Sequence, residues 1–393
     1  MRKDWEYKKL GEVAISDLGK TLNKSKDTGT LYPYLCAINI LWDKIDLSTL
    51  KETRFEDDEL GRYTVKYGDL LVCEGGDTGR AAIWDKQETM LYQNALHRIR
   101  LNNEINSRFL LYYLWQLKLN GEIDAKYSKG VTIKHLVKSS LMSIPTPIPP
   151  KPTQLAIVAE LDKINELIQL KKQQLKDYDQ LAQSIFYEMF GDPVENEKGW
   201  EVKKLGDICE VTSAKRVFIE EVVDSGVPFI RGTELTALNR LTRGEKMKYS
   251  LFITKEHYER LKAITGVPKY GDLLIPSINS EGIAWIVNTE EPLYFKDGRV
   301  LWVHVNQDVF KSECLQKIMN ILLKHTYKSM GGATFSELKL FVLRELKVPI
   351  PPIESQQQFA ARIEAIERQK QQVSETIKDL ETLLASRMQY WFD

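Results

Sequence analysis

The chain of 393 residues contains one long sequence pattern twice. Residues 5–13 return, with few changes, as residues 200–208, and residues 66–71 return as 269–274. From Gly130 onward the first copy aligns without a gap to the stretch that begins at Gly332. A period near 200 residues is far longer than the roughly 20 to 50 residues of a solenoid repeat. Each copy should therefore be a domain with its own core.

Each copy ends in a proline-rich segment followed by a helical pattern. The prolines lie in residues 144–152 and 348–352, where they can continue neither a helix nor a central strand. Thr153 and Ser355 follow them as candidate N-caps, and apolar residues then recur at steps of three and four. This predicts two long helices, over residues 151–194 and 353–393.

The apolar positions of the two helices form matching seams. A seam sustained over about five heptads is typical of a coiled coil. Each helix of about 38 residues would be about 57 Å long. The pattern predicts an antiparallel pair that acts as a spacer, with one unit at each end; the alternative is that each helix packs only on its own unit. The predicted interface residues are Leu161, Ile164, Ile168, Leu175, Tyr178, Ile185, Ile363, Ile366, Val373, Ile377, Leu380 and Leu384.

Within each copy, short strand patterns alternate with helical ones. Residues 69–73 and 272–276 read as buried strands, while residues 108–117 and 313–324 read as helices. The predicted fold class is α+β, with two similar globular domains joined by two long antiparallel coiled-coil helices in a pseudo-twofold symmetric arrangement. The predicted boundaries are 1–150 for the first domain, 151–194 for the central helix, 195–352 for the second domain and 353–393 for the distal helix.

Composition narrows the setting of the protein. No apolar run approaches the roughly 18 to 20 residues that span a bilayer, and the N-terminus lacks the apolar stretch of a signal peptide. The four isolated cysteines fit no zinc or redox spacing and read as reduced thiols, so we expect a cytoplasmic protein without membrane contact. A formal net charge of zero argues against a protein that coats polyanions indiscriminately.

The sequence offers few candidates for a catalytic centre. The chain has no phosphate-binding loop that ends in Gly-Lys-Ser/Thr, and residues 75–79 do not match a dinucleotide fingerprint. Every Pro-Pro pair lies in a linker, so the Pro-Pro motif of amino-methyltransferases is missing. Asp192, Glu201 and Lys203 loosely imitate a nuclease set, but the last two belong to the duplicated opening. The five histidines neither recur nor cluster. We expect no catalysis, metal or cofactor on this chain alone.

Binding residues are easier to nominate, because loops of small and polar residues follow the strands. Residues 75–80 form one such tip and residues 277–282 form its counterpart, in which Arg80 would suit guanine and Asn279 adenine. Cations in the turns at 19–26 and 214–216, and before Gly130 and Gly331, would suit phosphates. The predicted DNA contacts are Lys20, Lys24, Lys26, Gly76, Thr78, Arg80, Lys126, Lys129, Lys215, Arg216, Arg231, Asn279, Ser280 and Lys328.

The order of unit, Pro-Pro linker and helix, given twice, resembles the specificity subunits of type I restriction-modification systems. The resemblance covers the whole chain. It rests on the Trp-Glu-x-x-Lys-Leu-Gly openings at Trp5 and Trp200, the Gly-Asp-Leu-Leu strands at Gly68 and Gly271, and the linkers that precede a glutamine, together with Gly130-x-Thr132, Gly332-x-Thr334, Gln154, Gln356 and residues 190–193. The chain departs from the family at Lys151–Thr153, where an acidic residue is more usual before the glutamine.

The resemblance implies a non-catalytic reader of DNA. Each unit would be a target-recognition domain for one half of a bipartite, asymmetric site in double-stranded DNA. The helices would dock two modification subunits that methylate adenine with S-adenosylmethionine, and restriction subunits would add ATP- and Mg-dependent translocation and cleavage. Two alternatives stay open: a coiled-coil scaffold that binds no DNA, and the recognition subunit of another restriction architecture with a fused modification-cleavage protein.

Overall fold

The structure is a computed structural model that describes residues 5–23, 27–130, 134–241, 247–279, 281–329 and 337–393. It forms two compact units. Unit 1 comprises residues 1–170 and 377–393, and unit 2 comprises residues 171–376. Each of the two long helices therefore contributes one half to each unit, in addition to the globular bodies that the sequence indicates.

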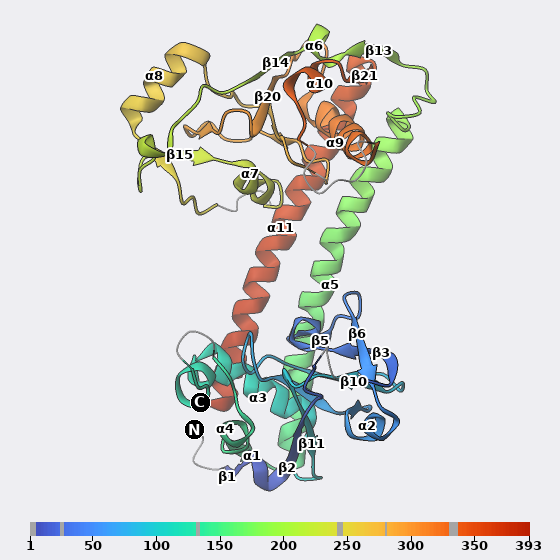
Figure 1. The fold of residues 1–393 in the computed structure, drawn as a ribbon, viewed down its shortest axis with the longest axis vertical. Helices are drawn as coiled ribbons and strands as arrows, with labels where there is room; N and C mark the ends of the chain where they lie inside the picture. Colours follow the sequence, from blue (N-terminus) through green and yellow to red (C-terminus); the bar gives the residue numbers. More distant parts are fainter. Residues whose placement is uncertain (1–4, 24–26, 131–133, 242–246, 280, 330–336) are drawn as a thin grey trace. The chain divides into compact units, whose positions relative to one another are not determined.

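Unit 1 is built around two small sheets (Figure 1). One has the strand order β2-β11-β8-β9 and is antiparallel, and the other has the order β6-β3-β10-β7, with β3 and β10 parallel. The elements are β1 (Glu6–Lys9), α1 (Leu10–Val13), β2 (Ala14–Leu18), β3 (Thr30–Leu35), η1 (Ala37–Asn39), β4 (Ile40–Leu41), β5 (Lys44–Ile45), β6 (Lys51–Phe55), α2 (Asp57–Arg62), β7 (Thr64–Val65), β8 (Leu70–Cys73), β9 (Ala81–Ile83), β10 (Met90–Tyr92), β11 (Leu96–Leu101), α3 (Ser107–Leu119), the π-helical turn η2 (Ile123–Tyr127), α4 (Lys138–Met142) and β12 (Pro145–Ile148).

Unit 2 repeats this plan. Its antiparallel sheet has the order β14-β20-β17-β18, and its second sheet, β16-β15-β19, keeps the parallel pair in β15 and β19. The elements are β13 (Glu201–Lys204), α6 (Leu205–Ile208), β14 (Glu210–Ser213), η3 (Ile219–Glu221), β15 (Val227–Ile230), α7 (Gly232–Leu238), β16 (Phe252–Ile253), α8 (Lys255–Thr265), β17 (Leu273–Pro276), β18 (Trp285–Ile286), β19 (Tyr294–Phe295), β20 (Val300–His304), α9 (Ser312–Ser329), α10 (Leu340–Arg344) and β21 (Lys347–Ile350). The α+β fold and the duplication are confirmed.

The duplicated Lys-Tyr-Gly-Asp stretch is a turn that starts the central strand of each antiparallel sheet. The Asp69 carboxylate accepts the Lys66 backbone N–H at 2.8 Å, and Asp272 accepts that of Lys269 at 2.9 Å. Gly68 and Gly271 have φ angles of 84° and 90°, a region that glycine adopts readily. The strands that follow, β8 and β17, are buried at every position. The motif recurs because both sheets need this turn.

The Trp-Glu openings and the proline linkers recur because they pair with each other. Strand β1 lies antiparallel to β12, with Glu6 opposite Ile148, and β13 lies antiparallel to β21, with Glu201 opposite Ile350. Each pair is a two-stranded sheet, in which every strand is an edge strand and proline is tolerated. The start and the end of each globular body are thus joined directly before the long helix begins.

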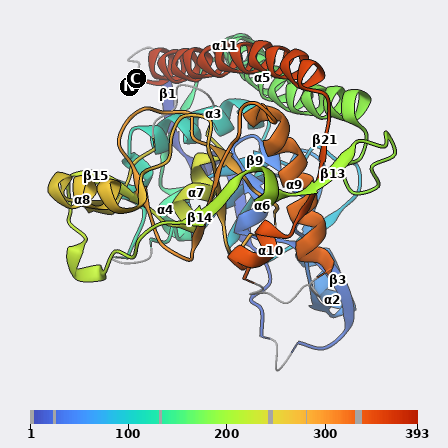
Figure 2. The same ribbon diagram turned by 90° about the horizontal axis from the view of Figure 1, so that it is seen from above.

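The two predicted helices are present as α5 (Lys151–Phe190) and α11 (Ile353–Phe392), and Figures 1 and 2 show them side by side. In unit 2, Lys370 pairs with Asp179 at 2.8 Å and Phe359 contacts Phe186, so the helices run antiparallel. In unit 1, Arg387 near the end of α11 bonds Glu160 near the start of α5, which fits the same antiparallel direction. The predicted interface residues are buried or half-buried: Leu161, Ile164, Ile168, Leu175, Tyr178, Ile185, Ile363, Ile366, Val373, Ile377, Leu380 and Leu384.

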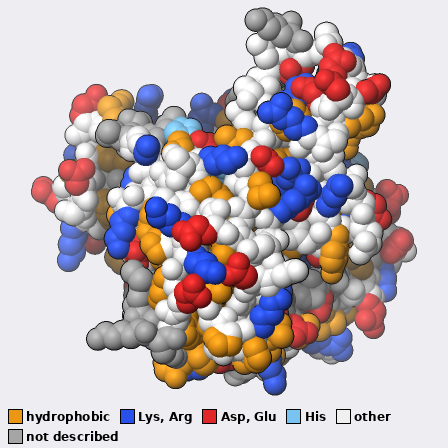
Figure 3. All heavy atoms as spheres, turned by 90° about the horizontal axis from the view of Figure 1, so that it is seen from below, with side chains coloured by type: hydrophobic (Ala, Val, Ile, Leu, Met, Phe, Trp, Pro, Cys, Tyr) orange, Lys and Arg blue, Asp and Glu red, His pale blue; other side chains and the backbone are white. Residues whose placement is uncertain are grey.

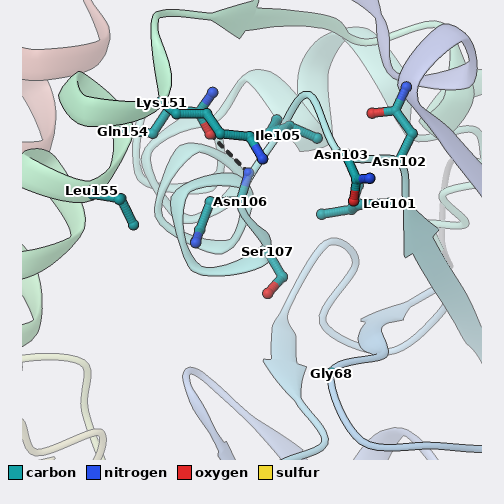
Figure 4. Close-up of a pocket in the computed structure, with 10 residues that line it drawn as sticks. All are labelled: Gly68, Leu101, Asn102, Asn103, Ile105, Asn106, Ser107, Lys151, Gln154 and Leu155. Atoms are coloured by element: carbon teal, nitrogen blue, oxygen red, sulfur yellow. Dashed lines mark hydrogen bonds between the residues drawn. The ribbon is translucent and has the colours of Figure 1, made fainter.

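The predicted caps Thr153 and Ser355 are wrong, because the helices already begin at Lys151 and Ile353. A buried glutamine one residue further on supports each start instead. The Gln154 amide donates to Glu104 O and Pro149 O at 2.9 and 2.8 Å. It accepts Asn106 N–H at 2.8 Å (Figure 4).

Gln356 makes the same three bonds with Val309 O, Pro351 O and Lys311 N–H, at 2.9, 2.8 and 2.9 Å. Each glutamine thus ties a linker, the long helix and the start of α3 or α9 together.

The long helices end within aromatic clusters. In unit 2, the Phe359 ring lies edge-on to Phe186 and Phe190, at centroid distances of 5.7 and 5.3 Å. In unit 1, Phe392 of α11 packs on Phe109 and Tyr113 of α3, at 5.3 and 5.5 Å. The helices are therefore part of the core of each unit as well as connections between the units.

Two further sequence expectations concern cysteines and membranes. All four cysteines, Cys36, Cys73, Cys209 and Cys314, are buried and free. Burial raises the pKa of the Cys73 thiol to about 11, which keeps it protonated at neutral pH. Among the described residues, no helix is long and apolar enough to cross a membrane.

Candidate nucleic-acid interface

The tip loop after β8 is the centre of a rim in unit 1, which we call rim 1 (residues 37–39, 74–80, 93–95 and 135–136). The Arg80 guanidinium donates to Ala37 O at 2.9 Å, which joins the tip to η1. Glu74 N–H donates to Ala95 O at 2.8 Å, and Leu136 N–H donates to Glu74 O at 2.7 Å. Four segments distant in sequence thus meet at the same edge of the fold.

The tip after β17 forms a corresponding rim 2 (residues 231–234, 277–279, 296–299 and 337–338). Ser277 N–H donates to Arg299 O at 2.9 Å, and Leu338 N–H donates to Ser277 O at 2.7 Å. A Cβ added to Gly232, the first residue of α7, would lie 3.5 Å from the Pro276 side chain. The same junction of loops therefore exists in both units.

The charge on the face shown in Figure 3 is mixed. On the face shown in Figure 3, Lys and Arg side chains are scattered among acidic and apolar ones and do not form one continuous basic surface. This agrees with the formal net charge of zero. A nucleic-acid contact on such a surface depends on individual side chains more than on a broad positive field.

Three predicted contact residues are held inside their units, contrary to the expectation that they face DNA. Lys20 is 5% exposed, with its ammonium 2.5 Å from Glu59 and 3.6 Å from Asp27. The Thr78 hydroxyl, 1% exposed, donates to Asp124 at 2.8 Å. A phosphate would have to compete with these carboxylates.

The third is Asn279. Its amide donates to Ile283 O at 2.6 Å and accepts Ile283 N–H at 2.8 Å. Because both ends of the amide hold the tip loop closed, this side chain is a poor reader of adenine.

Other predicted residues lie on the surface. Arg231 is exposed and pairs with Glu234 at 2.5 Å, and this bond lowers the pKa of the Glu234 carboxyl to about 2. Arg80 is half-buried, since it also bonds Ala37, and Lys126 pairs with Glu122 at 2.6 Å. The remaining exposed residues are Gly76, Lys129, Lys215, Arg216 and Lys328. Lys24, Lys26 and Ser280 lie outside the described residues, as do Thr132 and Gly332–Thr334 of the family motif.

Sequence reasoning missed the turns that follow β10 and β19. Gln93 N–H donates to Leu35 O at 3.0 Å, and Lys296 N–H donates to Ile230 O at 2.9 Å, so the turns correspond. Both turns lie directly before β11 and β20, strands whose first four residues are buried. The sequence shows the polar residues that precede each strand pattern. It does not show which other loops these residues contact in the fold.

The nuclease-like set is explained by structure. The Asp192 carboxylate accepts Val194 N–H at 2.8 Å, and Lys203 pairs with its neighbour Glu201 at 3.1 Å on an exposed edge strand. In the described ranges, no three His, Cys, Asp or Glu side chains are grouped so that they could hold a metal ion.

His97 gives unit 1 a pH-dependent support for its rim. Its ring is fully buried, with Nε2 2.6 Å from Leu136 O, and burial lowers its pKa below the usual 6.5. The unfolded chain gains a proton below about pH 6.5, whereas the folded unit accepts it only at lower pH, so stability falls in between, by at most about 1.4 kcal/mol per pH unit.

We therefore predict that unit 1 loses stability between pH 7.5 and 5.5 and that His97→Gln removes most of this dependence. Hydrogen exchange of β8 and β11, corrected for intrinsic rates, measures it. Unit 2 is the internal control, because Leu301 occupies the corresponding position on β20. An unchanged pH dependence in the variant would assign the effect to other groups.

Comparisons with known proteins agree with the duplication. A putative type I restriction enzyme specificity subunit of Haemophilus influenzae is 24% identical over 94% of this chain and 89% of its own length. The MjaVIII specificity subunit of Methanocaldococcus jannaschii is 23% identical, over 97% of this chain and 92% of its own.

Solved structures show the same fold. The S subunit of a type I restriction-modification system from M. genitalium has a TM-score of 0.50 at 17% identity, covering 99% of this chain and 96% of its own. A chain from a study of complex assembly and conformational transition in the type I system has a TM-score of 0.56 at 18% identity, covering 100% and 98%. The sequence family "Type I restriction modification DNA specificity domain" matches residues 2–177 and again residues 197–382. The chain thus belongs to the type I restriction-modification specificity family, with one family domain in each repeat.

Proposed function

We propose that this chain is the DNA-reading subunit of a type I restriction-modification complex and performs no catalysis itself. Rim 1 and rim 2 each read one half of a bipartite, asymmetric target in double-stranded DNA. Modification subunits that carry S-adenosylmethionine methylate adenine, and restriction subunits that use ATP and Mg cleave. S-adenosylmethionine, ATP and Mg would thus bind the partner subunits and not this chain.

The observation that carries the proposal is the pair of corresponding rims. The backbone bonds that join Glu74 to Ala95 and to Leu136 in unit 1 recur between Ser277 and Arg299 and Leu338 in unit 2. The framework is thus repeated, while the side chains that it displays differ. Two readers with one architecture and different surfaces suit a target whose two halves have different sequences.

Two stripes on the long helices support docking of two copies of one partner. Asp177, Leu181 and Ser184 on α5 recur as Asp379, Leu383 and Ser386 on α11, and all are exposed. Spacings of four and three residues place each stripe on one helix face. The leucines are 46% and 45% exposed although burial would be favourable. We propose that each stripe binds one modification subunit.

Replacing Leu181 or Leu383 with Asp should remove one modification subunit each, and the double variant should bind none. A charge in a buried apolar contact is strongly unfavourable. Native mass spectrometry of the complex gives the stoichiometry. Leu170→Asp is the matched control, because Leu170 is 59% exposed on α5 but its counterpart on α11 is Gln372. Two subunits retained on the double variant would place the docking surface elsewhere.

The assignment of roles is tested by methyl transfer. The purified chain should transfer no methyl group from S-adenosylmethionine to DNA, whereas the chain with its modification subunit should methylate adenine in a specific sequence. The modification subunit alone is the control. Methylation by the rigorously purified chain would contradict the proposed division of labour.

A further inference from the structure

The two rims share a backbone framework but differ in the side chains that they display. The turn after β10 in rim 1 and the turn after β19 in rim 2 are each fixed to the end of the parallel neighbour strand, through Gln93 N–H to Leu35 O and Lys296 N–H to Ile230 O. Backbone groups make these two bonds, so the bonds themselves do not require particular side chains at Gln93 or Lys296.

Rim 1 displays amides and an aliphatic side chain. Gln93 and Asn94 are half-exposed, and among the described residues neither side-chain amide has a hydrogen-bond partner. Ile38 in η1 is 60% exposed. Arg80 joins η1 to the tip by its bond to Ala37, the neighbour of Ile38. Rim 1 thus offers two unused amides and one exposed isoleucine.

Rim 2 displays cations at the corresponding turn. Lys296 is exposed, and the Arg299 side chain is 50% exposed. The nearest acceptor recorded for Arg299 is Glu337 at 3.5 Å, the outer limit of a hydrogen bond. Exposed ion pairs of this kind are weak. The guanidinium can therefore exchange this partner for a base.

The chemistry of these groups matches different base pairs in the major groove. A side-chain amide of Gln or Asn can bond adenine through N6 and N7, and an apolar side chain contacts the methyl group of thymine. An arginine fork bonds O6 and N7 of guanine. Lysine and arginine also contact phosphates without reading sequence. Arg299 would therefore read guanine only if its guanidinium fork made both of these bonds, whereas a phosphate contact would carry no sequence information.

On the basis of the proposed function, we propose that the rims read different classes of base pair. Rim 1 reads an A·T pair through the amides of Gln93 and Asn94, and rim 2 reads a G·C pair through Arg299. The half-site of unit 1 therefore contains an essential A·T pair, and that of unit 2 an essential G·C pair, at the positions that these side chains contact.

The test uses the complex of the full chain with its modification subunit. The complex methylates a library of DNA duplexes with randomised bases, and the methylated duplexes are then sequenced. Arg299→Ala should relax one G·C position in one half of the target, by roughly 5- to 150-fold, which is the discrimination of one bidentate contact. Arg299→Lys should not restore it, because an ammonium lacks the planar fork. The double variant Gln93→Ala with Asn94→Ala should relax an A·T position in the other half.

Two controls match these variants in chemistry. Arg260 on α8 is similarly exposed and pairs with Glu221 at 3.2 Å, and Gln87 is an exposed amide at the opposite end of β10 from Gln93. Arg260→Ala and Gln87→Ala should leave the target unchanged.

The inference would be overturned if Arg299→Ala weakened methylation of all sequences evenly and Arg299→Lys restored it, because this indicates a phosphate contact. Relaxation of the wrong class of base pair, or of none, would also overturn it. If the unaltered complex methylated no sequence in the library, the proposed function itself would fail.

Discussion

Phe359→Ala is expected to destabilise unit 2 by about 3–5 kcal/mol, the usual cost of truncating a fully buried phenylalanine. Phe359 is 0% exposed, lies near the start of α11 and packs edge-on against Phe186 and Phe190 of α5. The variant leaves a cavity at the point where both helices enter the core of the unit. Since domains are stable by about 5–15 kcal/mol in total, this loss is large.

Hydrogen exchange of β17 and β20, combined with urea unfolding, measures the effect in unit 2. Phe341→Ala is the matched control, because Phe341 is 68% exposed and its truncation should change stability by no more than about 0.5 kcal/mol. Equal losses in the two variants would mean that the helix ends do not belong to the core.

Exchanging residues 1–150 for those of another specificity subunit should change one half of the methylated target completely and leave the other half as it was. Each half is read by a separate rim in this account, and rim 1 lies entirely within the exchanged residues. The expected result is a hybrid target that combines one half from each parent.

The exchange must preserve the packing of α3, which lies in the exchanged residues, on the C-terminal end of α11. Phe109 and Tyr113 of α3 pack on Phe392, so one hybrid should retain both aromatic residues and a second should take the donor's residues. Both hybrids should show the same new half-site if they fold. A change in both halves of the target would contradict two independent readers.

The architecture was predictable because it depends on local patterns. The helices follow from apolar residues at helical spacing, and the strand β8 follows from four consecutive apolar residues after a glycine turn. The same reliance on local patterns explains why Thr153 and Ser355 were wrongly predicted as helix caps. They satisfy the local rule for a cap, whereas Gln154 and Gln356 act through contacts with segments about 50 residues away, such as Glu104 and Val309.

The interface was harder to predict, because exposure depends on partners that are distant in sequence. Lys20 carries the positive charge expected of a phosphate contact, but its ammonium pairs with the Glu59 carboxylate within the fold. The turn at Gln93 becomes part of a rim only because Ala95 bonds Glu74 and because Leu136 joins them. No spacing in the sequence indicates that these residues meet.

Reading of DNA by two separate units is tested most directly by a map of methylated adenines in the DNA of a host that carries this chain and its modification subunit. We expect one new asymmetric motif, made of two short specified parts separated by unread base pairs, that disappears when the chain is removed. A continuous motif, or no new motif in cells that contain the assembled complex, would contradict reading by two separate units.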